Sequence, residues 1–138
     1  MNLIVCVDDS MGMMFNKRRQ SKDATVREDM LAMLPAGKKL FVTPYTAKQF
    51  LPEEQDKLSM CDTLSDFTKQ EDAFFFAEDL PVAGLESVTG QVVLYRWNRA
   101  YPSDVKFTFD LSGYEMVSCE DFIGNSHPEM KKEIYKKK

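Results

Sequence analysis

The sequence predicts an α/β domain with a central, mostly parallel mixed sheet, helices on both faces and antiparallel strands toward the C-terminus. Two observations predict this class. Apolar, β-branched or aromatic runs without polar alternation, typical of strands covered on both faces, occur at 2–8, 39–43, 73–77 and 91–97. Helical or loop patterns separate these runs, whereas strand patterns alone follow residue 105. The length of 138 residues suits a single domain over 1–138.

The first strand pattern, at 2–8, is followed by a turn-forming Asp9-Ser10-Met11-Gly12 segment. Residues 13–24 then mix methionine, basic and polar side chains without a usable period, so we expect a long loop there. Long loops inside compact domains are usually functional or disordered. This one is therefore a candidate site.

A helix is expected from Thr25. Thr25 can cap it, and Glu28 follows three residues later, as in a capping box. One face of this helix is apolar, with Val26, Met30, Met33 and Leu34 at helical spacing. Pro35 and Gly37 stop it.

The remaining elements are read in the same way. A short helix is expected from Pro44 to about Phe50, and a weak one between Pro81 and Leu85. The polar segment 51–71 is expected to hold a loop and one short strand or helix. Later strands are expected at 106–109, 114–119 and 133–137.

Charge is distributed unevenly around a net value of −4. Residues 16–27 are strongly basic, whereas residues 53–79 are mostly acidic. A negative net charge argues against extended duplex DNA binding, which needs a broad basic surface. The basic segment can still hold one anion through Lys17, Arg18 and Arg19. The alternative is an exposed loop kept soluble by its charge.

Several classes of protein are not expected. Cys6, Cys61 and Cys119 are an odd number without a CxxC pair, which argues against a disulfide framework or a metal site. The sole histidine, His127, is interpreted as a loop residue, because no serine or cysteine with an orienting acid lies near it in the sequence. No run is long enough to span a membrane, and no signal peptide is evident, so we expect a cytoplasmic protein.

Particular segments, in their order, resemble dihydrofolate reductase. The opening Met1 to Asp8 with Gly12 is similar to that family's first strand and mobile loop, and Gly37 to Val42 with Tyr45-Thr46 is similar to the strand and turn that lead to its cofactor site. Five later segments resemble the last strands of that family. They are Leu94-Tyr95-Arg96-Trp97, Ala100 to Asp104, Gly113 to Ser118, Asn125-Ser126-His127 and Glu133 to Lys136. The resemblance covers about residues 1–50 and 72–138, with a shortened middle at 51–71.

This resemblance implies site residues. The family's cleft carboxylate matches Asp29 best, within Arg27-Glu28-Asp29-Met30, and Asp23 is the alternative. The same resemblance implies a substrate pocket of Ile4, Val5 and Met30, with Lys57 near the position of an arginine that binds the folate tail. Gly12 and Thr46 are implied as cofactor contacts.

Other positions depart from the family. Its Gly-Arg-x-Thr turn reads Thr43-Pro44-Tyr45-Thr46 here, without the arginine that neutralises phosphate. Its Gly-Gly pair reads Ala77-Glu78, and a carboxylate there would repel a pyrophosphate. NADPH is therefore not expected to be used in the ordinary way, although the resemblance implies it.

Two hypotheses follow. The first is a dihydrofolate-reductase-like protein that binds a small heteroaromatic or anionic ligand in a cleft; if it is an enzyme, the resemblance implies an oxidoreductase with Asp29 as its catalytic acid. The alternative is a non-enzymatic protein whose basic loop 16–27 contacts an RNA phosphate or an acidic protein.

Overall fold

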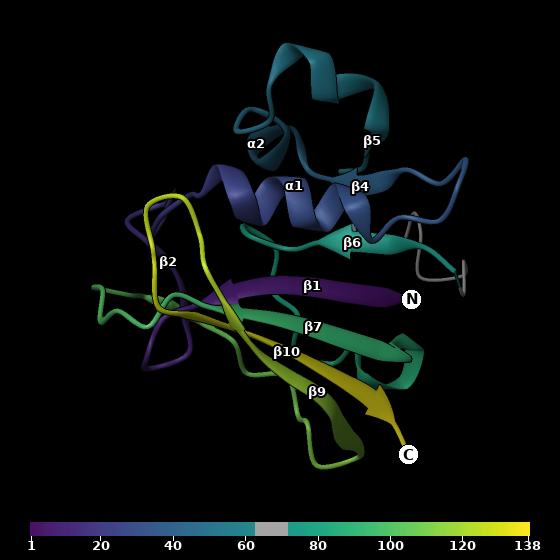
Figure 1. Cartoon of the computed structure of the whole chain (residues 1–138). Coiled ribbons are helices and arrows are strands. Elements are labelled where there is room, and N and C mark those ends of the chain that lie inside the picture. Colours follow the sequence, from purple (N-terminus) through teal and green to yellow (C-terminus); the bar gives the residue numbers. More distant parts are fainter. Residues whose placement is uncertain (63–71) are drawn as a thin grey trace.

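The computed structural model describes residues 1–62 and 72–138. Within these residues the main sheet has seven strands in the order β5-β4-β6-β1-β7-β10-β9 (Figure 1). Their bounds are β1 (Asn2–Val7), β4 (Leu40–Val42), β5 (Leu58–Met60), β6 (Phe74–Phe76), β7 (Gln91–Arg96), β9 (Tyr114–Phe122) and β10 (Met130–Lys137). The five strands from β5 to β7 are mutually parallel, while β10 runs antiparallel to both β7 and β9. The predicted mostly parallel sheet with antiparallel C-terminal strands is confirmed.

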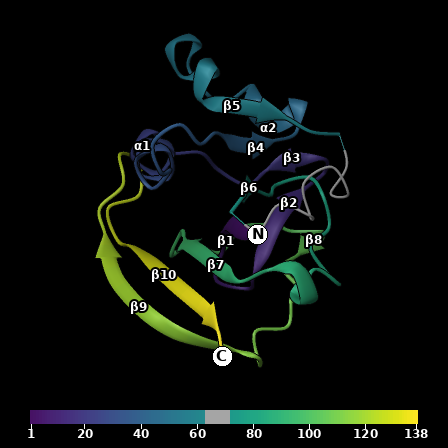
Figure 2. The same cartoon turned by 90° about the vertical axis from the view of Figure 1, so that its right-hand side faces the viewer.

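Alternate side chains of β1 pack on opposite faces of the sheet. Leu3, Val5 and Val7 enter one core, whereas Ile4 enters the other. This two-sided burial explains why the strand lacks polar alternation. Helix α1 (Ala24–Ala32) packs on the Ile4 face, and a small second sheet lies on the opposite side (Figure 2).

The second sheet occupies much of the segment expected to be a loop. It contains β2 (Gly12–Phe15), β3 (Arg18–Arg19) and β8 (Val105–Lys106), in the order β3-β2-β8. The expectation of a loop over 13–24 was therefore wrong in part. Met13 and Met14 are buried in the core, and Gly12 and Met14 pair with β8, far along the chain. Such a long-range partner leaves no local period in the sequence.

The start of α1 differs from the expected capping box. Asp23, not Thr25, is the N-cap, and its carboxylate accepts hydrogen bonds from the backbone N–H groups of Thr25 and Val26. A cap two residues earlier is favoured because the loop 124–127 also donates hydrogen bonds to Asp23.

Several other elements are shorter than expected. Helix α2 (Pro44–Ala47) stops before Phe50, and the strand expected at 106–109 is limited to β8. The helix expected before Leu85 is replaced by a 3-10 helix, η3 (Glu86–Val88). In the acidic segment, a 3-10 helix η1 (Pro52–Lys57) precedes β5, which agrees with the expected short elements. The expectation for 63–71 lies outside the described residues.

Candidate functional site

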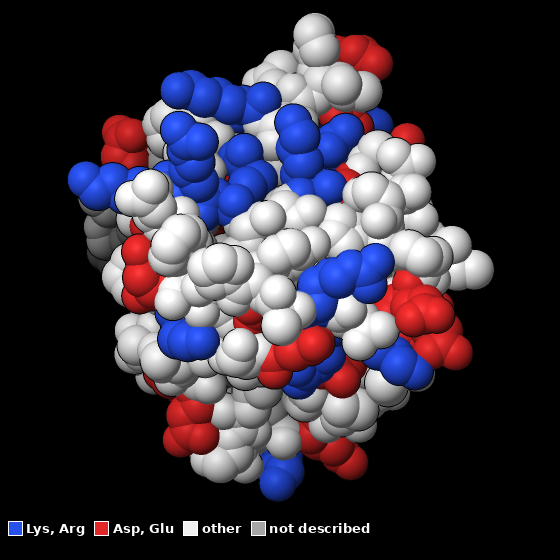
Figure 3. Space-filling view, turned by 90° about the vertical axis from the view of Figure 1, so that its left-hand side faces the viewer, with Lys and Arg blue, Asp and Glu red and all other residues white. Residues whose placement is uncertain are grey.

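The candidate site lies where the parallel strands of the main sheet end. Residues 8–22 follow β1, residues 43–47 follow β4, and residues 77–79 follow β6. Ligands of open α/β sheets usually bind beyond the carboxyl ends of the strands. Lysine and arginine side chains gather on part of the face at this end of the molecule (Figure 3).

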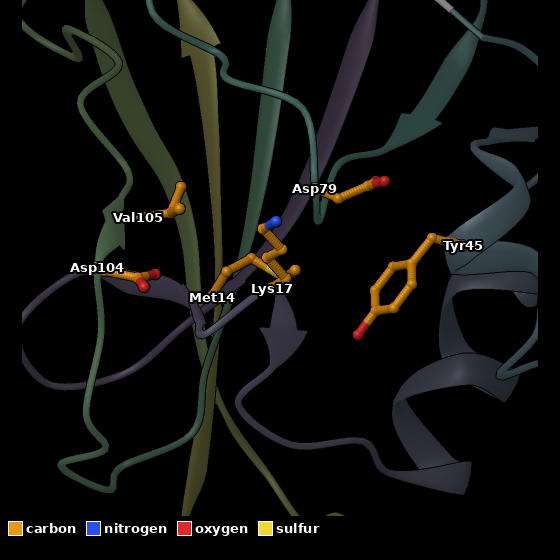
Figure 4. Close-up of a pocket in the computed structure, with 6 residues that line it drawn as sticks. All are labelled: Met14, Lys17, Tyr45, Asp79, Asp104 and Val105. Atoms are coloured by element: carbon orange, nitrogen blue, oxygen red, sulfur yellow. The ribbon is translucent and has the colours of Figure 1, made fainter.

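Two pockets here share the side chain of Tyr45. The first, the mixed pocket, has a volume of about 410 Å³. Its lining combines apolar groups with charges of both signs, from Met14, Lys17, Tyr45, Asp79, Asp104 and Val105. The ring of Tyr45 extends from α2 toward the residues of β2 and β8 across this space (Figure 4).

The second pocket, the basic pocket, has a volume of about 500 Å³ and is more open. It is lined by Arg18, Arg19, Ser21, Lys22 and Tyr45. Both volumes lie in the range of small-molecule sites. The structure therefore brings Lys17, Arg18 and Arg19 to two adjoining pockets, as the charge pattern of the sequence suggested.

Arg19 differs from its basic neighbours because it has an internal partner. Its Nε and Nη2 donate to the two carboxylate oxygens of Glu78 at 3.0 and 3.2 Å. Its guanidinium also lies 4.4 Å from the centre of the Tyr45 ring. Burial raises the pKa of Glu78, and the hydrogen bonds and charge of Arg19 oppose that rise. Arg19 thus compensates a buried acid.

The N-terminus of α2 is occupied by side chains of the protein. Thr43 caps the helix by accepting from the backbone N–H of Thr46, and its hydroxyl donates to Asp79 at 2.7 Å. Thr46, which the family resemblance implied as a cofactor contact, is fully buried. Two carboxylates, Asp79 and Glu78, follow β6 near this turn.

Gly12, the other implied cofactor contact, has a clear packing role. Its backbone N–H donates to Asp8 Oδ1 at 2.7 Å. A Cβ at this position would lie 2.5 Å from the Cβ of Ser103. Burial raises the pKa of Asp8, but donors that include Gly12 and Tyr101 outweigh this and hold the pKa below its ordinary value.

Comparison with known proteins identifies the fold. No protein-family model and no curated protein sequence matches the chain. Among solved structures, it is similar to dihydrofolate reductase from Enterococcus faecalis, solved in complex with NADP(H) and RAB-propyl. The match has a TM-score of 0.73 and covers 99% of this chain and 95% of that chain, at 11% sequence identity.

The chain has the dihydrofolate reductase fold. The resemblance predicted from the sequence is thereby confirmed at the level of fold. An identity of 11% says nothing about activity, because one fold can host many functions. Within the described residues, no helix is long and apolar enough to cross a membrane.

Asp29, implied as the cleft acid of a dihydrofolate reductase, faces other partners. Its carboxylate lies 2.7 Å from Lys132 Nζ on β10 and accepts a hydrogen bond from the hydroxyl of Tyr95 on β7. Burial, followed by this hydrogen bond, raises the pKa of Tyr95. The mixed and basic pockets are lined by other residues. The role of Asp29 as a site acid stays a prediction.

The other residues implied by the dihydrofolate reductase resemblance are spread between core and surface. Ile4, Val5 and Met30 are fully buried. Lys57 is exposed at the last position of η1. None of these four lines the mixed or the basic pocket. Their roles in ligand binding stay predictions.

The sequence did not predict a buried polar cluster that lies beside the basic pocket. His127 is only 4% exposed, and its ring packs 4.5 Å from that of Trp97. Its Nδ1 lies 3.3 Å from Asp23 Oδ2, while its Nε2 lies 3.1 Å from both Ser21 Oγ and the Tyr101 hydroxyl. A lone histidine gave no signal of these contacts, because its partners lie elsewhere in the sequence.

Asp23 is also held from several sides. Burial raises the pKa of this carboxyl, but the backbone N–H groups of Asn125 and Ser126, together with His127, outweigh burial and lower the pKa far below its ordinary value. Gly124 allows this close approach, since a Cβ there would lie 2.6 Å from Asp23 Oδ2. Asp23, the alternative cleft acid of the sequence analysis, is therefore ionised and built into the fold.

Proposed function

We propose that this protein binds a small heteroaromatic anion across the mixed and basic pockets, with the ring beside Tyr45 and the negative group at Arg18 and Lys22. The observation that carries the proposal is the position of Tyr45, which lines both pockets. Tyr45 and Met14 offer apolar surface, and the neighbouring pocket offers positive charge. Pockets of this composition suit small ligands with one charged group.

Arg18 and Lys22 of the basic pocket, with Lys17 of the adjoining mixed pocket, offer positive charge to an anion. In the described residues, Lys17, Arg18 and Lys22 form no ion pair, whereas Arg19 is engaged by Glu78. Lys17, Arg18 and Lys22 are also exposed. A ligand can therefore gain their charge without breaking an existing pair. Arg19 contributes by holding the Tyr45 ring.

A dinucleotide cofactor fits these residues poorly. Thr43 already caps α2, Asp79 accepts from Thr43, and buried Glu78 stands after β6. A diphosphate placed at this helix end would meet two carboxylates and would compete with the existing cap. We therefore propose that the ligand is smaller than NADPH and that ordinary NADPH-dependent reduction is not its function.

Thermal unfolding with and without ligands tests this proposal. The compounds are dihydrofolate, a folate antagonist, inorganic pyrophosphate and NADPH. A ligand at about 100 times its Kd adds about 2.7 kcal/mol to the stability of the protein, enough for a shift of several degrees. We expect a shift with dihydrofolate or pyrophosphate and none with NADPH.

The double variant R18A/K22A is expected to lose the anion-dependent shift, and its residual binding should depend less on salt. Its matched control is K38A/K39A, which removes two exposed lysines outside both pockets. The proposal fails if no anionic compound shifts the melting temperature, or if R18A/K22A and K38A/K39A behave alike. A shift with NADPH would instead indicate a dinucleotide site.

A further inference from the structure

Ser21, His127 and Asp23 form a hydrogen-bonded series beside the basic pocket. We propose that Ser21 is a nucleophile activated by His127, and that the protein cleaves carboxylic esters that carry an anionic group. Ser21 belongs to the lining of the basic pocket, together with Arg18 and Lys22. The anionic preference rests on the proposed function, whereas the nucleophile rests on the geometry of the series alone.

The hydrogen bonds around Asp23 fix the direction of the series. An ionised carboxylate only accepts, so the proton on the neutral His127 ring must be on Nδ1, 3.3 Å from Asp23 Oδ2. The Ser126 hydroxyl lies 3.0 Å from His127 Nδ1 and donates to Asp23 Oδ2 at 3.2 Å. Ser126 therefore does not need Nδ1 as an acceptor. The Nε2 lone pair is then left to accept a proton from the Ser21 hydroxyl at 3.1 Å. This is the tautomer that a general base for serine requires.

Burial supports a positioned base. The side chain of Asp23 is 0% exposed and that of His127 is 5% exposed, so the imidazole ring and the carboxylate are both shielded from water. Trp97 holds one side of the imidazole. Ser21 itself is only half-buried and lines the basic pocket. A rigid base beside an accessible hydroxyl is the arrangement that nucleophilic catalysis needs.

The reaction balances with water as the only co-reactant. Ser21 Oγ attacks the ester carbonyl carbon while its proton passes to His127 Nε2, and the alcohol leaves with that proton to give an acyl-serine. Water then attacks the acyl-serine, gives a proton to Nε2, and the proton returns to Ser21 as the carboxylic acid departs. Arg18 and Lys22 in the same pocket would balance the anionic group of the substrate.

Tyr101 competes for the same nitrogen. Its hydroxyl also lies 3.1 Å from His127 Nε2, so one lone pair faces two donors. Only one of the two hydroxyls is held strongly at a time. Removal of the Tyr101 hydroxyl should therefore increase the share of molecules in which Ser21 is the donor.

The first test uses a neutral fluorophosphonate, which needs no anion site. Ser21 Oγ attacks phosphorus, fluoride leaves, and His127 takes the proton. Intact-mass spectrometry and peptide mapping are expected to show one adduct, on Ser21, formed at least about 100-fold faster than on unfolded protein. Ser21→Ala should lose the adduct, while Ser10→Ala, a change at an exposed serine, should retain it.

Variants of the supporting residues separate chemistry from folding. His127→Gln should slow labelling at least about 100-fold, and Tyr101→Phe, which leaves the base intact, should label at least as fast as the native chain. Asp23→Asn keeps a helix-capping side chain, so it should lower the maximal labelling rate without weakening probe affinity. Melting temperatures confirm that each variant is folded.

The outcomes distinguish this inference from the proposed function. Two results together would support both the nucleophile and the anionic substrate class. Ser21 is labelled in the native chain and in R18A/K22A, and only the native chain cleaves an anionic nitrophenyl ester faster than its neutral analogue. Labelling without that preference overturns the anionic substrate class. No adduct on Ser21, or equal labelling of a folded His127→Gln variant, overturns the nucleophile even where pyrophosphate still binds.

Discussion

Arg19 and Glu78 form a two-pronged ion pair that joins β3 to the segment after β6. The side chain of Glu78 is 8% exposed and that of Arg19 is 19% exposed, so the pair is largely shielded from water. One of the expected anion ligands therefore neutralises the acid that stands in place of the family's glycine pair. The charge of the basic pocket thus depends more on Arg18 and Lys22 than on Arg19.

Arg19→Met is expected to lower the free energy of unfolding by about 3 kcal/mol, because Glu78 would stay buried without its partner. Urea denaturation followed by circular dichroism measures this. The double variant R19M/E78Q should recover part of the loss, since no unpaired charge remains. Equal losses in the single and double variants would show that the ion pair contributes nothing specific.

Acid should destabilise the protein through Asp23. The pKa of Asp23 in the folded state lies below its ordinary value of 3.8, so its stabilising contribution is fully present above about pH 4 and is lost as the pH falls further. We expect a loss of about 2 kcal/mol between pH 5 and pH 2 in urea denaturation.

The variant Asp23→Asn supplies the control for the acid effect. It should be less stable at pH 7 and should show a shallower decline below pH 4. Some decline should persist, because the pKa of Asp8 is also held below its ordinary value. The same slope in the native chain and in Asp23→Asn would contradict the assignment to Asp23.

The sequence predicted the centre of the main sheet because its central strands are continuous apolar runs, such as Phe74–Phe76. It did not predict β2 or its pairing with β8, because that pairing joins Gly12 to Lys106 and depends on no local pattern. The basic loop was recognisable from charge alone. The approach of His127 to Ser21, 106 positions apart, was not, because only the folded chain brings them together.

Gly12→Ala should be strongly destabilising, since its Cβ would lie 2.5 Å from the Cβ of Ser103 and 2.6 Å from Gln20 Nε2. Overpacking of this kind costs about 1–3 kcal/mol. Thermal unfolding measures the loss. Gly113→Ala is the matched control, because a Cβ there meets open space. Addition of Ser103→Gly to Gly12→Ala should restore part of the stability, and no recovery would place the clash elsewhere.

Asp29 distinguishes a structural acid from a ligand-binding acid. Its partner Lys132 has a side chain that is 13% exposed, so Asp29→Asn would leave a largely buried ammonium group without its counter-charge. We expect the free energy of unfolding to fall by about 2 kcal/mol, with partial recovery in D29N/K132Q. If Asp29 only ties α1 to β7 and β10, the affinity for dihydrofolate should stay within about twofold, because a change in affinity needs a contact that differs between the bound and free states. Loss of dihydrofolate binding in the folded D29N/K132Q variant would instead support the family-based prediction that Asp29 contacts the ligand.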